Sequence, residues 1–193
     1  MGDKSDASWI RILDNVVGLI VIVVAIVAIL ELAFSFIYAL EVLLVGLLSM
    51  GIAWIVMGVY ILRAYLFARL FMLITGIAAI VIALVDFIFI SLPPDYLVLY
   101  PTMAMVLVGS SRLVLGFFVV ELTLWIRMLQ VMAGILTVNL AAFVFIFPGI
   151  TFQGVIILLV ISFMANGLVR LIVGRTEMKR KIMQTSEDAS ISE

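Results

Sequence analysis

Two arginines that stand in otherwise apolar segments have the most unusual chemistry in this sequence. Arg112 and Arg170 lie inside long apolar runs, and a guanidinium in hydrocarbon costs about 3 kcal/mol on insertion scales, so it is usually paired with an acid or a carbonyl group. The arginines predict either a clamp that ties helices together, which the sequence favours, or a site for an anionic ligand or lipid headgroup. At a depth of roughly 9 to 12 Å they can also snorkel to the membrane surface.

Three polar residues are candidate partners for these arginines. Asp14 and Gln130 occupy equivalent positions of an internal repeat at a compatible depth, and Glu121 follows the run that holds Arg112. Arg112 and Arg170 are themselves equivalent in that repeat. The first repeat has Trp54 at their position, which rules out a site made of three equal arginines.

Acidic residues gather near the opposite ends of the apolar runs, without basic residues beside them. They are Glu31, Glu41, Asp86 and Asp95. Crowded carboxylates would make this outer face sensitive to external acid. The alternative, which we favour, is that they are solvated helix ends, where polar groups are needed in any case.

Most residues on which enzymes rely are missing. Cys and His are both absent, which removes disulfides, thiolate and imidazole metal ligands and cysteine nucleophiles. An intramembrane enzyme would need paired acids or a nucleophile with its base at catalytic depth, and the apolar runs offer no such arrangement. We therefore expect no catalytic residue, no metal site, no cofactor and no enzymatic activity.

The composition is that of an integral membrane protein. Hydrophobic residues make up 67% of the 193 residues and charged residues 12%, unlike the usual balance of soluble domains. A hydrocarbon core of about 30 Å needs about 20 helical residues, and six runs are long enough: residues 13–35, 38–62, 69–91, 96–120, 127–147 and 151–175. The expected partner is the lipid bilayer, and no nucleic acid is expected.

The chain repeats itself at an interval of 58 residues. Arg11, Arg69 and Arg127 form one column of the repeat, and three further columns contain only glycine, which predicts close helix packing. The glycines are Gly18, Gly76 and Gly134, then Gly51, Gly109 and Gly167, and then Gly58, Gly116 and Gly174.

Each repeat holds two spans joined by a short turn, which predicts a helical hairpin. We expect an N-terminal segment 1–8, hairpins 9–66, 67–124 and 125–176 in one membrane domain, and a disordered tail 177–193. Two spans return the chain to its starting side, so the fold class is an all-α membrane bundle of six helices, with pseudo-threefold symmetry about the membrane normal. Small residues on two sides of each second helix predict that these helices form the inner ring.

Basic residues in the connections lie on one side of the expected bundle. They are Lys4, Arg11, Arg63, Arg69, Arg127, Arg175, Lys179, Arg180 and Lys181, and the three outer turns contain none. The positive-inside rule then predicts that both termini are cytoplasmic and that the protein lies in the cell membrane.

The same features resemble the HdeD-like family of small membrane proteins. The resemblance rests on Gly18-Leu19, Gly76-Ile77 and Gly134-Ile135, on Phe147-Pro148 at an outer turn, and on the Gly-x-x-Arg-Leu segments that begin at Gly109 and Gly167. It covers residues 9–175, and Trp54 departs from it. It implies a six-span protein associated with acid or stress resistance, with no established reaction or ligand.

Two classes of function remain open from the sequence. The favoured class is a structural or stress-protective bundle that occupies the membrane, alters its permeability, or binds a protein partner or another copy of itself. The alternative is an accessory subunit of a larger membrane complex or, with less support, a small transporter or channel. A conducting path needs a polar lining, but the polar residues of the spans are scattered. Asn139, near mid-depth of its span, predicts an interhelical hydrogen bond.

Overall fold

The computed structural model describes residues 6–60, 66–89, 93–119, 122–147 and 149–191. Within these ranges the chain is all helical, as expected, and contains no strand. The helices are α1 (Asp6–Glu31), α2 (Phe36–Tyr60), α3 (Leu66–Ile88), α4 (Pro94–Phe118), α5 (Leu124–Ile146) and α6 (Phe152–Ile191). All six contain a segment long and apolar enough to cross a membrane, which confirms the expectation of six spans.

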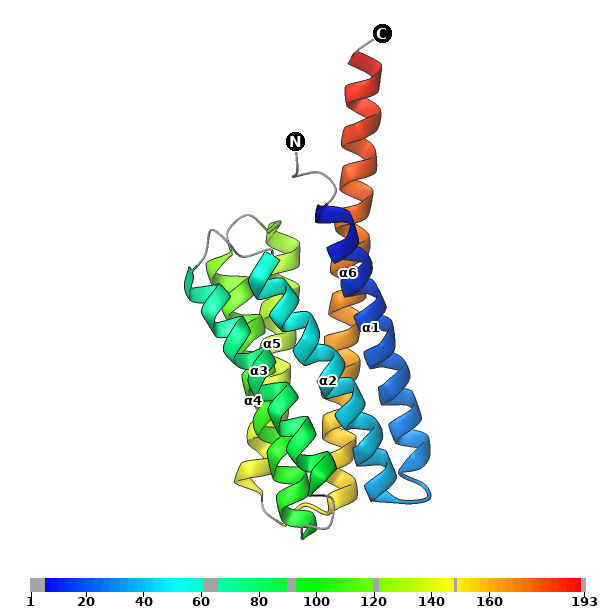
Figure 1. Cartoon of the computed structure of the whole chain (residues 1–193), viewed down its shortest axis with the longest axis vertical. Coiled ribbons are helices and arrows are strands. Elements are labelled where there is room, and N and C mark those ends of the chain that lie inside the picture. Colours follow the sequence, from blue (N-terminus) through cyan, green and yellow to red (C-terminus); the bar gives the residue numbers. More distant parts are fainter. Residues whose placement is uncertain (1–5, 61–65, 90–92, 120–121, 148, 192–193) are drawn as a thin grey trace.

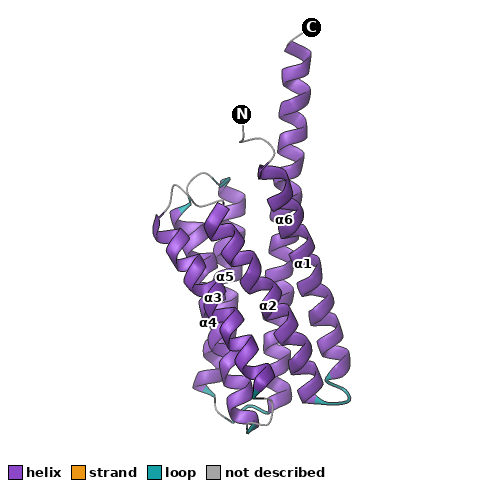
Figure 2. Ribbon diagram, viewed as in Figure 1, coloured by secondary structure: helices purple, strands orange, loops and turns teal. Residues whose placement is uncertain are grey.

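Short turns with local capping bonds end and restart the helices. α1 ends at Glu31, whereas the sequence predicted a span that continues to residue 35. The amide of Phe34 bonds to the Glu31 carbonyl at 2.9 Å, a bond across three residues that tightens the chain into a turn. The Ser35 hydroxyl accepts the amide of Ile37 at 3.2 Å as α2 begins, the usual role of serine before a helix. The turn between α1 and α2 is a short loop at the end of the bundle (Figure 2).

The helices stand side by side, and α1 begins at the same end of the bundle at which α6 leaves it (Figure 1). We call this the terminal end and the opposite end the turn end. α6 continues to Ile191, far beyond the other helices, whereas a disordered tail was expected from residue 177. The first residues of that tail are mainly Glu, Met, Lys, Arg and Gln, which favour the helical state and therefore extend the last span.

Helices α2, α4 and α6 form the interior of the bundle. Each of the three contacts the other two, whereas among the described residues α1, α3 and α5 contact only their two neighbours around the ring. Between 50% and 56% of the residues in the spans of α2, α4 and α6 are buried, against 28% to 33% for α1, α3 and α5. The expected inner ring of second helices is therefore present.

Pairs of glycines mark the closest contacts between neighbouring helices. A Cβ atom on Gly76 of α3 would lie 2.7 Å from the carbonyl oxygen of Gly51 of α2, and a Cβ atom on Gly51 would lie 2.9 Å from that of Gly76. Side chains do not fit at such distances, so only glycine allows these backbones to approach. Two other pairs meet in the same reciprocal way. The distances from an added Cβ atom to the carbonyl oxygen of the partner glycine are 3.1 and 2.8 Å for Gly109 with Gly134, and 3.0 and 2.9 Å for Gly18 with Gly167.

The third glycine column lies closer to the terminal end. A Cβ atom on Gly58 would lie 3.2 Å from the carbonyl oxygen of Arg69, one on Gly116 would lie 3.0 Å from that of Arg127, and one on Gly174 would meet the side chain of Asn15. These contacts join each second helix to the next first helix. The pairing of α6 with α1 closes the ring.

Candidate functional site

Arg112 lies at the centre of a buried polar cluster in the terminal half of the bundle. It belongs to α4 and is only 1% exposed. Its Nη1 donates to Oε1 of Gln130 at 2.6 Å, its Nη2 to the backbone oxygen of Asn166 at 2.8 Å, and its Nε to the side-chain oxygen of Asn166. Because Gln130 belongs to α5 and Asn166 to α6, one guanidinium joins three helices.

Asn166 is fully bonded at the middle of this cluster. It has no exposed surface, and its Nδ2 donates to Oγ1 of Thr137 at 3.0 Å and to the backbone oxygen of Ser162 at 2.7 Å. Its side-chain oxygen accepts from Arg112. A buried polar network of this kind stabilises only when its members are satisfied, and Asn166 uses its whole amide.

Arg170 of α6, the repeat equivalent of Arg112, forms an ion pair with Asp14 of α1 through its Nη1. The side chains are 3% and 13% exposed. The pair joins the first and the last helix of the chain beside the contact of Gly18 with Gly167. The Nε and Nη2 atoms of Arg170 have no hydrogen-bond partner among the described residues.

The indole ring of Trp54, on α2, lies within cation–π distance of both arginines. The Cζ atoms of Arg170 and Arg112 lie 4.9 and 5.8 Å from its centroid, within the range of a cation–π interaction. Trp54 is 1% exposed. The three residues of one repeat column, one from each inner helix, therefore meet inside the bundle, and the aromatic ring stands where a third guanidinium would otherwise be.

A small void lies next to the cluster. Its volume is about 10 Å³, it is lined by Leu13, Asp14, Ala53, Val56 and Met57, and a space of that size holds at most one water. The described residues contain no group of three or more His, Cys, Asp or Glu side chains that could hold a metal ion. The side chains of Arg112, Gln130 and Asn166 bind one another, whereas Nε and Nη2 of Arg170 and Nε1 of Trp54 have no hydrogen-bond partner among the described residues.

Neither buried arginine snorkels to the surface, although the depth expected from the sequence would have allowed it. Gln130, Asn166 and Asp14 lie at the same depth on the facing helices and supply acceptors there. The expected partners Asp14 and Gln130 are therefore both brought to the arginines. Glu121 lies outside the described residues.

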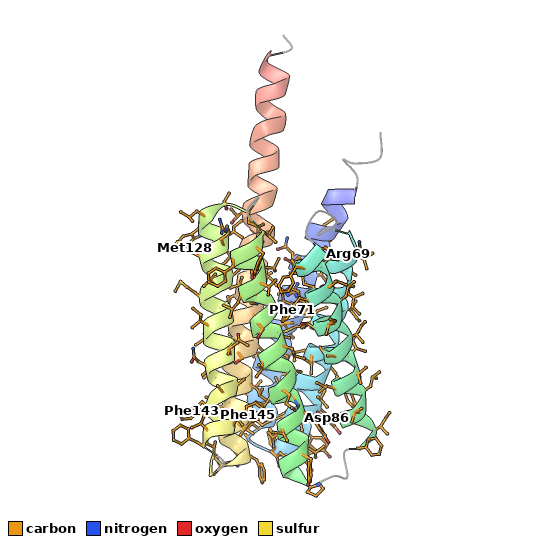
Figure 3. All side chains as sticks on the ribbon, turned by 90° about the vertical axis from the view of Figure 1, so that its left-hand side faces the viewer. Arg69, Phe71, Asp86, Met128, Phe143 and Phe145 are labelled. Atoms are coloured by element: carbon orange, nitrogen blue, oxygen red, sulfur yellow. The ribbon has the colours of Figure 1, made fainter. Side chains whose placement is uncertain are left out.

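The acidic residues of the turn end do not share one environment. Glu31 and Glu41 are half-buried beside the first turn, whereas Asp86 is 0% exposed and neither of its carboxylate oxygens has a hydrogen-bond partner among the described residues. Asp86 lies near the turn end of α3 (Figure 3), on the same face as the buried Ala79 and Ala83. This helical register places it inside the bundle, so it is not a solvated end. The side chain of Asp95 lies outside the described residues.

Arg127, which shares a repeat column with Arg11 and Arg69, caps another helix. Its Nε donates to the backbone oxygen of Gly116 at 2.9 Å and its Nη2 to that of Phe117 at 3.3 Å. The last carbonyl groups of a helix lack partners within the helix, and a basic side chain can satisfy them. Arg127 of α5 thereby holds the end of α4.

Asn166 and Thr137 are the members of the cluster that sequence reasoning missed. One signal was present: Asn166 precedes Arg170 by one helical turn on the same span, which places a polar group on the face that carries the arginine. The repeat did not indicate a polar residue at this position, because Met50 and Val108, the residues equivalent to Asn166, are apolar.

No protein-family model, no curated protein and no solved structure matches this chain. The fold and the site define its class. It is a multi-pass, all-helical membrane protein with a buried cluster of arginine, amide and aromatic side chains inside the bundle.

Proposed function

We propose that this chain is a non-enzymatic membrane protein whose buried arginines clamp the bundle, and that it acts through its surface by binding a protein partner or another copy of itself. The observation that carries this proposal is the state of Arg112. Each of its three nitrogens already has an oxygen partner from the protein, and the neighbouring void has room for one water. A structural clamp accounts for these contacts better than a ligand site.

The proposed setting is the cell membrane, with both termini in the cytoplasm and a role in resistance to acid or other stress. The basic residues of the connections support the orientation, and the resemblance to HdeD-like proteins supports the role. The proposal includes a pseudo-threefold arrangement of three hairpins. It is supported by the three glycine pairs, which join equivalent positions at α2 with α3, at α4 with α5 and at α6 with α1.

Transport receives less support from the geometry. A conducting path needs a continuous polar lining, whereas Arg112, Gln130 and Asn166 are bonded to one another and the buried core is formed mainly of apolar side chains, among them Leu43, Met105 and Phe163. An accessory role in a larger complex remains compatible with action through the surface.

The test is survival of a deletion strain after a shift to low external pH. We expect survival to fall on deletion and to be restored by the intact chain and by Gly149→Ala, because a Cβ atom there meets nothing within 4 Å. Unchanged survival across external pH would contradict the acid-resistance role. Reporter fusions at both ends test the orientation, and an external terminus would overturn it.

A further inference from the structure

Asn139 is a polar residue on the membrane-facing side of α5. Its side chain is exposed, and its Nδ2 donates to the backbone oxygen of Ile135 of the same helix at 2.9 Å. It lies four residues from the middle of the span Leu124–Ile146, or roughly 6 Å along the helix axis, well inside a hydrocarbon core of about 30 Å. The interhelical hydrogen bond expected of Asn139 is thus not made to another described helix of this chain.

The residues equivalent to Asn139 in the other two repeats are also exposed on the surface of the bundle, but they are apolar. They are Val23 of α1 and Val81 of α3, which are 50% and 51% exposed. The position is therefore lipid-facing in all three first helices, and apolar in two of them. Only α5 carries an amide there, and an amide that faces hydrocarbon is costly unless it finds a partner.

The surroundings of Asn139 form a continuous stripe along α5. Met128, Met132, Ile135, Asn139, Phe143 and Ile146 follow one another at intervals of three or four residues, so they share one face of the helix. The five apolar members are 44% to 68% exposed, and Met128 and Phe143 point away from the bundle (Figure 3). The spacing defines one face of the helix, and the single polar residue among apolar ones is the feature by which a helix–helix contact can set its register.

α5 is also the span with the least contact inside the chain. Only 28% of its residues are buried, the lowest share of the six, and it contacts only α4 and α6. The stripe lies on the side that neither neighbour covers.

We propose that two copies of this protein pair through α5, with the Asn139 side chains of the two copies hydrogen-bonded to each other across a twofold axis along the membrane normal. A second copy fits better than another occupant because it lies in the membrane with the same orientation, so that its Asn139 is at the same depth. The amide carries both donors and an acceptor and is therefore complementary to itself. The pairing rests on the proposed action through the surface, for which it names the partner, and not on the role in acid resistance.

Disulfide cross-linking in native membranes tests the pairing, because the chain contains no cysteine. Met132→Cys and Ile146→Cys place single thiols on the stripe and keep Asn139. Ile74→Cys and Ile88→Cys are the matched controls, since they occupy the equivalent positions on α3 and are 62% and 72% exposed. We expect a mild oxidant to give disulfide-linked dimers from the α5 variants and not from the α3 variants. Equal cross-linking from both helices, or none from α5, would overturn the proposal.

The role of the amide is tested with Asn139→Val, which installs the residue of the other two repeats. The purified protein is placed in lipid vesicles at decreasing ratios of protein to lipid, and single-molecule photobleaching counts the copies in each complex. We expect the dissociation constant of the dimer to rise about three- to thirtyfold, the range that one interhelical hydrogen bond supplies, while Val81→Ala leaves it unchanged. An unchanged constant in Asn139→Val, a monomer at every dilution, or a different protein held at α5 in place of the second copy would each contradict the proposal.

Discussion

Asn166 accepts two hydrogen bonds from the Arg112 guanidinium, one with its side-chain oxygen and one with its own backbone oxygen at 2.8 Å. Because the second acceptor belongs to the main chain of α6, this double contact fixes the position of α4 against α6 as well as the side chains. It makes Arg112 the member of the cluster on which most of the other contacts depend.

Replacement of Arg112 by Met therefore removes the donors that serve the buried oxygens of both Asn166 and Gln130. Each buried polar group left unsatisfied costs about 1–3 kcal/mol, so we expect the protein to insert into the membrane but to unfold more easily, by about 2–5 kcal/mol in total. Thermal unfolding of the purified protein in mild detergent measures the change.

The matched control is Arg127→Met at the end of α4. It removes bonds to backbone oxygens at the terminal end, where water can replace them, and its cost should be about 1 kcal/mol. If Arg112→Met leaves stability intact but abolishes survival at low pH, the result would contradict the structural clamp and favour a ligand site at Arg112.

Trp54 and Met72 allow the broken repeat to be restored. Trp54→Arg alone places a third guanidinium in a cluster that contains one carboxylate, and a buried charge without a partner costs several kcal/mol, so we expect little folded protein. Met72 is fully buried and occupies the position of Asp14 and Gln130 in the second repeat. Adding Met72→Asp should recover part of the yield, as measured by size-exclusion chromatography of the detergent extract. Met72→Asp in the protein that keeps Trp54 should not be tolerated.

Gly76→Ala tests the glycine pairs. The new methyl group would lie 2.7 Å from the backbone oxygen of Gly51, and a backbone cannot move aside as a flexible side chain can, so α2 and α3 must separate. We expect a loss of about 1–3 kcal/mol, typical of overpacking, seen as a lower unfolding midpoint. Gly149→Ala meets no atom within 4 Å and should be neutral. Equal midpoints for the two variants would show that the close approach contributes nothing.

Asp86→Ala should raise stability rather than lower it. The carboxyl group is fully buried and neither oxygen has a hydrogen-bond partner among the described residues, and the first repeat has the buried Ala28 at the equivalent position. Removal of an unsatisfied polar group from an apolar site stabilises by about 1–3 kcal/mol. Asp86→Asn, which keeps an unsatisfied polar group of the same shape, should give no comparable gain. A fall in the unfolding midpoint of Asp86→Ala would reveal a partner for this carboxyl group.

The sequence alone was sufficient for the features that repeat. Apolar runs of membrane length predicted the six spans, and the equivalence of Asp14 with Gln130 pointed to the partners of both arginines, because equivalent residues meet equivalent neighbours in a repeated structure. Features that occur once were harder to predict. Asn166 replaces apolar residues of the other repeats, and its role depends on the rotation of α6 about its axis. The burial of Asp86 depends in the same way on which face α3 turns inward.

The environment of Asn139 could not be predicted from the sequence either, although here the side chain is exposed rather than buried. Its residue type predicts a hydrogen bond to another helix, but neither hydropathy nor spacing tells whether its face points into the bundle or to the lipid. That distinction arises only when α4 and α6 occupy the other side of α5.

The ion pair of Asp14 with Arg170 joins residues that are 156 positions apart. During synthesis the first span therefore enters the bilayer with its carboxylate unpaired, and the cation that neutralises it arrives only with the sixth span. A nascent chain interrupted at any earlier point exposes an acid and an uncovered glycine face to lipid.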